Sequence, residues 1–304
     1  MNQSHPAITV VIPTHNRASF LKRAIDSVLS QTWKDFELII VDDASTDNTA
    51  EIIRSYYDSR IVYIRHQENK GGSAARNSGI LQAKGRYIAL LDDDDEWEPT
   101  KLEKQFIKFQ DVSEKVGIVY SGFEVKDQDR KVIERRLPEF KGNLYMRLLE
   151  RNMIGGSSTP LIKRECFDAA GLFNESLRSC QDWDMWLRIS KLYEFDFVPE
   201  IGTNIYLHGD QISEDFSSMI PGRSRMIETH MDEFSAYPGI LVIHLKRMGK
   251  MHCINGTWKE AFAWFAKAID VNHLEIIKIS AWCLIELPRI KMLSKFKYFK
   301  KYRP

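Results

Sequence analysis

The chain has 304 residues, of which 43% are hydrophobic and 28% charged, an ordinary globular profile that excludes wholesale disorder. This length is enough for one large domain or two modest ones, and the net charge of +1 argues against a dedicated nucleic-acid binder. The four cysteines are scattered without a CxxC pair, so structural zinc and redox motifs gain no support and we expect a reduced, cytoplasmic setting.

The N-terminal stretch MNQSHPAITVVIPTHN lacks the charged and long apolar regions of a signal peptide. No run approaches the roughly 18 apolar residues that a membrane crossing needs. We therefore expect a soluble protein, or one peripheral on a membrane.

The first 120 residues alternate between two kinds of pattern. Short apolar, β-branched or aromatic runs, typical of strands buried on both faces, stand at 7–12, 36–41, 61–64, 87–91 and 117–123. Helical patterns lie between them at 19–31, 45–57 and 73–85, the last closing on Gly85 as a candidate C′ residue. This alternation predicts an α/β fold with a doubly wound, mostly parallel sheet, whose ligands bind beyond the carboxyl ends of the strands.

The pattern changes after this first part. Residues 140–220 are less regular and are expected to complete a site rather than form a separate fold. From about residue 223 the chain is predicted to be helical, and residues 287–304 carry seven Lys or Arg and no acidic residue.

Four consecutive aspartates follow the predicted strand in YIALLDDDDEWEP, residues 87–99. Carboxylates this close repel one another and raise one another's pKa unless a cation joins them. Asp92 and Asp94 form a DxD pair whose hard oxygen ligands suit Mg²⁺ or Mn²⁺ bridging a diphosphate. Asp95 is interpreted as a cap or supporting residue. The alternative is a solvated acidic loop.

Polar residues also follow the first two predicted strands. In VVIPTHN, Pro13 and Thr14 offer backbone and hydroxyl contacts, and in IIVDDAS the Asp43 carboxylate could accept hydrogen bonds from a base. Alternatively, the acidic residues there merely cap the next helix. In KGGSAARN, a glycine turn that includes Gly71 opens a helix carrying Arg76, which could reach a uracil carbonyl or a phosphate.

The segment SCQDWDMWLRIS, residues 179–190, places acidic and aromatic residues at helical spacing. Asp182 could point into a cleft while the tryptophans pack, a setting in which a general base can be tuned. Alternatively, Asp182 caps a helix and Trp183 and Trp186 are core residues. His208, in YLHGDQIS, is a candidate metal ligand or phosphate contact, although a single histidine is more often structural.

Together the segments VVIPTHNR, FELIIVDDASTDNT, NKGGSAARNSGI and YIALLDDDDEW resemble the family-2 glycosyltransferases of the GT-A fold, over roughly residues 7–215. The resemblance implies that Asp94 binds the metal, with His208 as a second candidate ligand, and that Asp182 is the catalytic base. It implies a nucleotide-sugar-binding set of Pro13, Thr14, His15, Asn16, Asp43, Gly71, Arg76, Asp92, Asp93 and Ser213. Within this set, Asp92 is expected beside the ribose and diphosphate, and Ser213 on a loop that closes over the diphosphate with His208.

Two positions depart from the family pattern. His15 stands where the family often has Tyr, which bears on how a base would stack. Gln181 stands where Glu is common, so Asp182 must carry the acidic role alone or acceptor recognition has changed.

The resemblance implies an inverting, metal-dependent hexosyl- or N-acetylhexosaminyltransferase of the bacterial surface-polysaccharide type. It would use Mn²⁺ or Mg²⁺, a nucleoside-diphosphate sugar, expected to be UDP-linked, and a hydroxyl of a glycan or lipid-linked glycan as acceptor. Two alternatives stay open. A sugar nucleotidyltransferase would usually show a glycine-rich basic loop that PTHNR lacks, and Gln181 leaves room for a non-catalytic sugar-nucleotide-binding protein.

Three regions follow from this interpretation. Residues 1–120 are expected to form the nucleotide-sugar-binding half of one GT-A domain, residues 121–222 its acceptor-binding half, and residues 223–304 a helical region with a basic tail. The tail interleaves aromatic and basic residues, which suits the headgroup region of an anionic membrane on its cytoplasmic side. Alternatively, it is solvated or packs on a partner subunit.

Overall fold

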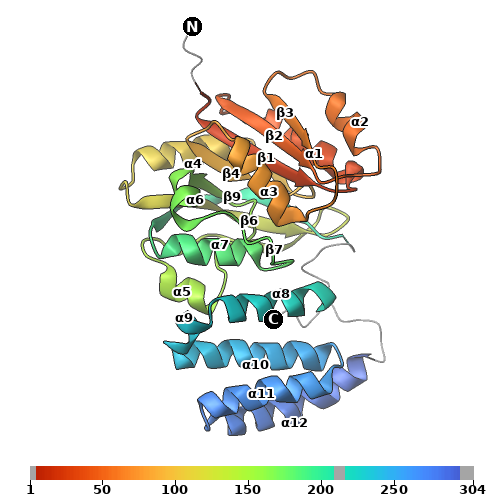
Figure 1. The fold of residues 1–304 in the computed structure, drawn as a ribbon, viewed down its shortest axis with the longest axis vertical. Helices are drawn as coiled ribbons and strands as arrows, with labels where there is room; N and C mark the ends of the chain where they lie inside the picture. Colours follow the sequence, from red (N-terminus) through yellow and green to blue (C-terminus); the bar gives the residue numbers. More distant parts are fainter. Residues whose placement is uncertain (1–4, 209–215, 295–304) are drawn as a thin grey trace. The chain divides into compact units, whose positions relative to one another are not determined.

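A computed structural model describes residues 5–208 and 216–294 (Figure 1). The chain divides into two compact units, Met1–Gln211 and Ile212–Pro304. Ser213, a predicted nucleotide-sugar-binding residue, and residues 295–304 of the basic tail lie outside the described residues.

The first unit is built around one mixed sheet with helices against both faces (Figure 1). Its strands are β1 Ile8–Thr14, β2 Phe36–Asp42, β3 Ile61–Arg65, β4 Tyr87–Leu90, β5 Glu96–Trp97, β6 Val116–Lys126, β7 Val132–Arg136, β8 Pro160–Lys163 and β9 Glu194–Tyr206. Its helices are α1 Ala18–Leu29, α2 Thr49–Arg54, α3 Gly72–Gln82, α4 Lys101–Gln110, α5 Tyr145–Glu150, α6 Glu165–Ala170 and α7 Gln181–Ser190. All five strands predicted from the sequence are present.

The strand order is β3-β2-β1-β4-β8-β6-β9-β5, with β7 paired to β6. The first four strands in this order are all parallel, with Ile8 in register with both Phe36 and Tyr87. Strand β8 runs antiparallel to both β4 and β6, whereas β9 is parallel to β6. The predicted α/β fold is therefore confirmed, with a parallel N-terminal half and a mixed second half.

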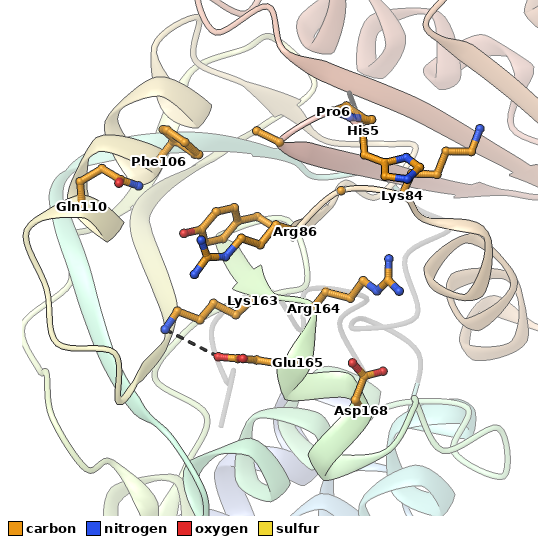
Figure 2. A pocket seen from close by; sticks show the side chains of 13 residues that line it. His5, Pro6, Lys84, Arg86, Phe106, Gln110, Lys163, Arg164, Glu165 and Asp168 are labelled. Atoms are coloured by element: carbon orange, nitrogen blue, oxygen red, sulfur yellow. Dashed lines mark ion pairs between the residues drawn. The ribbon is translucent and has the colours of Figure 1, made fainter. Parts of the chain in front are cut away.

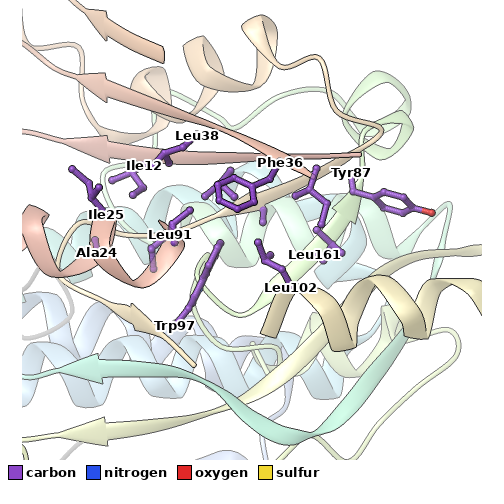
Figure 3. Close-up of a cluster of buried hydrophobic side chains, with 14 of the residues drawn as sticks. Ile12, Ala24, Ile25, Phe36, Leu38, Tyr87, Leu91, Trp97, Leu102 and Leu161 are labelled. Carbon is purple, nitrogen blue, oxygen red and sulfur yellow. The ribbon is translucent and has the colours of Figure 1, made fainter. Parts of the chain in front are cut away.

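Both faces of β1 are buried, which explains its continuous apolar sequence. Alternate residues Ile8, Val10 and Ile12 belong to a core formed with α1 and α4, part of which Figure 3 shows. Val11 points to the opposite face. There, a Cβ on Gly79 of α3 would lie 2.3 Å from a Val11 methyl carbon, so only glycine lets this helix pack so closely.

Gly85 was predicted as a helix C′ residue, and this prediction is wrong. Helix α3 ends at Gln82, and Ala83 is already extended. Gly85 instead approaches β1, where an added Cβ would lie 2.5 Å from the backbone nitrogen of Thr9. The glycine is required by close contact between chain segments and not by a left-handed helix end.

The second unit is helical over its described residues, as the sequence predicts. Its helices are α8 Phe216–Thr229, α9 Met231–Ser235, α10 Pro238–Ile254, α11 Trp258–Val271 and α12 Glu275–Ser294. Gly249 lets α10 approach α11 closely, because a Cβ there would lie 2.4 Å from a ring carbon of Phe265. None of the helices within 5–208 and 216–294 combines the length and apolar character that crossing a membrane requires.

Candidate active site

The polar segments that follow β1, β2 and β4 lie at one edge of the sheet. These strands are neighbours and parallel, so their carboxyl ends point the same way. Three further segments contribute side chains to the same cluster: the loop before β8, the first turn of α7 and the residues after β9. The structure therefore brings together predicted site residues that are more than 100 positions apart in the chain.

Asp43 is a buried acceptor at the end of β2. Its carboxylate accepts hydrogen bonds from the backbone N–H groups of Lys70 and Gly71, at 2.9 and 2.7 Å, and from Nδ1 of His66 at 2.7 Å. Gly71 has φ of +91°, a conformation that favours glycine. An ionised carboxylate has about four lone-pair sites, so roughly one remains for a ligand such as a base N–H.

His15 and Asn16 connect the segments after β1 and β2. The Nδ1–H of His15 donates to the carbonyl of Asp43 at 2.7 Å, and its Nε2 accepts from the Asn16 amide at 3.1 Å. The Asn16 side-chain oxygen accepts from the backbone N–H of Thr46 at 2.7 Å. Asn16 thus holds two loops together, and the His15 ring lies beside the Asp43 backbone.

Arg76 links the predicted DxD pair to the start of α7. From α3, its guanidinium donates to Asp92 at 2.5 Å and to the side-chain oxygen of Gln181 at 3.1 Å. The Asp92 carboxylate also accepts from Ser157 at 3.2 Å and remains 30% exposed, so it is accessible to a ligand. Gln181 directly precedes Asp182 at the start of α7. The family departure at Gln181 therefore provides a neutral acceptor for Arg76.

Asp94 lies between two cationic or proton-donating side chains. Its Oδ2 is 2.8 Å from Nε2 of His208 and 2.6 Å from a guanidinium nitrogen of Arg17. Burial opposes ionisation of Asp94, but the hydrogen bond from His208 and the charge of Arg17 outweigh it and lower its pKa. The ring of His208 also stacks on Phe20, with centroids 4.5 Å apart.

The neighbouring carboxyl groups are less readily ionised. Burial, together with the charge of Asp94, raises the pKa of Asp93 to about 6, although Arg17 acts in the opposite direction. Burial and the charges of Asp94 and Asp92 raise the pKa of Asp95 well above its ordinary value. Asp95 accepts a hydrogen bond from Ser158 at 2.5 Å.

Asp182 lies in the first turn of α7, where its Oδ2 accepts from the Asn152 amide at 2.9 Å. Burial raises the pKa of Asp182 to about 6, with the charge of Asp92 in the same direction and Arg76 in the opposite one. A carboxyl group with this pKa is largely ionised at neutral pH and is more basic than an exposed aspartate. Trp183 and Trp186 are buried, so the tryptophans pack as the sequence predicts.

The donor set fits a hard divalent cation that keeps most of its coordination for substrate and water. Asp94 and His208 face each other, and Nδ1 of the buried His208 has no hydrogen-bond partner among the described residues. In the part of the chain that the structure describes, no group of three or more His, Cys, Asp or Glu could hold a metal. Two protein ligands nevertheless suffice for Mg²⁺ or Mn²⁺ when phosphates supply others.

Several contributors were not predicted from the sequence. Arg17, Asn152, Ser157 and Ser158 contact the aspartates, and His66 contacts Asp43. Arg17 stands in the segment PTHNR, so its place directly after a strand end could have identified it. The asparagine and serines lie in the irregular region before β8, where no periodic pattern marks them.

A separate cavity of about 470 Å³ lies where β1 and β4 begin, at the opposite end of these strands from the aspartates. Figure 2 shows Lys84, Arg86 and Arg164 among its lining residues, with Lys163 paired to Glu165 at 3.7 Å. The described residues that line it include none of the predicted site residues. The candidate site therefore rests on the side chains gathered at the strand ends.

The carboxylates of Asp43, Asp92, Asp94 and Asp182 thus lie in one cluster at the carboxyl ends of the strands. Residues 9–169 match the family model described as Glycosyl transferase family 2. The chain belongs to this family. A GT-A fold was predicted for it, and the solved structures it resembles support that fold.

Two relatives illustrate the family match. The putative teichuronic acid biosynthesis glycosyltransferase TuaG of Bacillus subtilis is 33% identical over 193 residues, which cover 63% of this chain and 75% of that protein. The putative colanic acid biosynthesis glycosyl transferase WcaA of Escherichia coli is 32% identical over 240 residues, covering 76% and 84%. The chain spans 36% of the length of an uncharacterized glycosyltransferase of Rickettsia felis, with 34% identity over 220 residues that cover 70% of this chain.

Two solved structures have similar folds. S. aureus TarS 1–349 in complex with UDP-GlcNAc aligns with a TM-score of 0.63 at 16% identity, covering 97% of this chain and 93% of that one. The mannosyltransferase PcManGT from Pyrobaculum calidifontis, in complex with GDP-Man and Mn²⁺, aligns with a TM-score of 0.58 at 15% identity, covering 97% and 88%. At these identities the likeness establishes the GT-A fold alone.

Proposed function

We propose that this protein is an inverting glycosyltransferase that moves a hexose or N-acetylhexosamine from a UDP-sugar to a hydroxyl of a glycan acceptor. The observation that carries the proposal is the cluster around Arg76. Its guanidinium contacts Asp92 of the DxD pair and Gln181, the residue before Asp182. Groups suited to a diphosphate and a group suited to deprotonation are thereby joined in one site.

The donor would be held by the segments after β1, β2 and β4. The remaining acceptor capacity of Asp43 suits an N–H of the base, beside the His15 ring and the end of β1, where Pro13 and Thr14 lie in the strand and not in the tight turn that the sequence suggested. The partly exposed carboxylate of Asp92 suits the ribose and the region near the diphosphate. These residues all belong to the proposed nucleotide-sugar half, residues 1–120.

Asp182 would act as the general base. Its raised pKa allows it to take a proton from the acceptor hydroxyl, and Asn152 fixes the orientation of its carboxylate. The oxygen would then attack the anomeric carbon from the side opposite the diphosphate, in one displacement that inverts the configuration. This step needs no covalent nucleophile. Both residues lie in the proposed acceptor half, residues 121–222.

Asp94 and His208 would hold Mn²⁺ or Mg²⁺, which supplies charge stabilisation for the departing diphosphate. Support for a sugar nucleotide with such a cation comes from the similar folds solved with UDP-GlcNAc and with GDP-Man and Mn²⁺. Both uridine and guanosine nucleotides occur among these neighbours, so the test of the donor must include both.

A panel of nucleotide sugars tests the proposal. We expect UDP-sugars with Mn²⁺ to raise the thermal unfolding temperature of the protein more than the matching GDP-sugars do. One of the UDP-sugars should also be turned over, with slow release of UDP in water alone and rapid release when an acceptor is present. Measurement of released nucleoside diphosphate and pyrophosphate separates the alternatives. Pyrophosphate-linked turnover would indicate a nucleotidyltransferase, whereas stabilisation with no turnover across a glycan acceptor panel would indicate a binding protein.

We also propose peripheral binding to the inner face of the cytoplasmic membrane through the C-terminal region, which would present a lipid-linked acceptor. In helix α12, Ile276, Ile277, Leu284 and Ile285 are exposed, with Ile277 at 69% and Leu284 at 79%. At about 100° per residue, Ile277 and Leu284 lie on one side of the helix, and Ile276 and Ile285 flank them to either side. The basic residues of 287–304 follow directly in the sequence. An apolar face next to basic residues suits an anionic lipid surface.

Co-sedimentation with phosphatidylglycerol liposomes tests this membrane contact. The full chain is expected to bind at low salt and to be released at high salt, because each Lys or Arg contributes about 1 kcal/mol that ions screen. Truncation after Glu286 should abolish binding, and Ile277→Ser/Leu284→Ser should weaken it at every salt concentration. Equal sedimentation of the full chain and its variants, or of none of them, would rule out the membrane role.

A further inference from the structure

Arg17 is a cation that forms ion pairs with Asp94, the predicted metal ligand, and with its neighbour Asp93. It directly follows Asn16, a predicted nucleotide-sugar-binding residue. The backbone carbonyl of Arg17 accepts hydrogen bonds from the N–H groups of Phe20 and Leu21 at the start of α1. Its guanidinium lies 3.2 Å from Asp93 and 2.6 Å from Asp94. One side chain thus bridges both carboxylates, from a backbone fixed by the helix start.

The contact to Asp94 involves the same oxygen that faces His208. Oδ2 of Asp94 lies 2.6 Å from the Arg17 nitrogen and 2.8 Å from the His208 nitrogen. A divalent cation bound between Asp94 and His208 would need this oxygen, and it would meet the positive charge of Arg17 at contact distance. Two cations so close repel strongly in a partly buried site. The guanidinium and the metal therefore compete for one oxygen.

We propose that Arg17 is a resident counter-ion that competes with the divalent cation for Asp94, so that the metal binds by displacing its guanidinium. Its contact with Asp93 gives the displaced side chain a second anchor within the site. In the donor-free protein this competition keeps metal affinity low and neutralises the aspartates, which would otherwise repel one another. The inference rests on the proposed metal at Asp94.

Binding of Mn²⁺ to the donor-free protein, followed by the electron paramagnetic resonance signal of free Mn²⁺, tests the proposal without any turnover. Arg17→Met removes the charge and keeps a long side chain, and it should tighten Mn²⁺ binding by at least tenfold. Arg17→Lys keeps the charge and should stay within about threefold of the unaltered protein. The gain should disappear in Arg17→Met/Asp94→Asn, since the charged carboxylate for which Arg17 and the metal compete is then replaced by a neutral amide.

Chemical modification of the unaltered protein gives an independent measurement if Arg17→Met does not fold. Because the metal displaces the guanidinium from Asp94, saturating Mg²⁺ should speed the reaction of Arg17 with phenylglyoxal, measured by peptide mass spectrometry. Exposed Arg54, which lies outside the site, provides the reference rate.

The outcomes are distinguishable. Unchanged or weaker Mn²⁺ binding in Arg17→Met, a gain that persists without Asp94, or an unchanged modification rate would overturn the competition and leave the metal assignment standing. If the unaltered protein and all variants bind no Mn²⁺ at millimolar concentration, both the inference and the metal part of the proposed function fail.

Discussion

Replacing Asp94 with alanine is expected to lower turnover of the sugar nucleotide by a factor on the order of 10³ or more, because the cation that stabilises the departing diphosphate loses its carboxylate ligand. Asp94 is buried and lies 2.8 Å from His208, so His208 alone would remain to hold the metal. The measurement is release of nucleoside diphosphate across a Mn²⁺ titration.

Asp129→Ala is the matched control for Asp94→Ala. Asp129 is an exposed aspartate between β6 and β7, and its loss should change neither turnover nor its dependence on Mn²⁺. Because Asp94 also forms an ion pair with Arg17, its replacement affects the stability of the fold as well as metal binding. The thermal unfolding temperature of Asp94→Ala separates these two effects. Full turnover in Asp94→Ala, or in the unaltered protein with excess chelator, contradicts the metal assignment.

Asp182→Asn is expected to lower kcat by a factor on the order of 10²–10⁴, the usual contribution of a general base. Donor affinity should change little, because Asp92 and Asp43 are untouched. In the unaltered protein kcat should fall as the pH drops through about 6, where Asp182 takes up a proton. Steady-state kinetics between pH 5 and 8 measure both effects, and the variant should lose this pH dependence.

Stability provides the control for Asp182→Asn. The pKa of Asp182 is raised from 3.8 to about 6 in the folded protein, so its ionisation lowers stability as the pH rises from about 4 through 6. The asparagine variant should therefore be no less stable at pH 7.

By contrast, Asp184→Asn on the same helix breaks the 2.9 Å ion pair with Arg188 and should lower the unfolding temperature while leaving the pH profile of kcat intact. A collapse of donor affinity with kcat retained would make Asp182 a binding residue.

Residues that follow a strand directly were predictable from the sequence. Asp43, Asp92 and Asp94 each come at or just after the end of an apolar run, and neighbouring parallel strands bring such positions to one edge. The helical spacing of residues 179–190 agrees with α7, Gln181–Ser190, whose first turn contains Asp182, whereas its role as a base came from the family resemblance and stays a prediction. Gly85 was misassigned because a glycine near a helix end can be either a left-handed C′ residue or a site of close contact with another segment, and the sequence alone fits both equally well.

The sequence by itself determined strands β1, β2, β3, β4 and β6, the helices between the first four of them and the acidic and glycine-bearing segments that follow, because apolar periodicity and turn residues act over a few positions. Only the tertiary structure decided that β8 enters antiparallel between β4 and β6, and that Asn152 reaches Asp182. It also decided that His208 meets Asp94 across 114 positions and that Arg17 shares the same oxygen. Such contacts depend on the order of strands in the sheet and the paths of irregular segments, which no local pattern encodes.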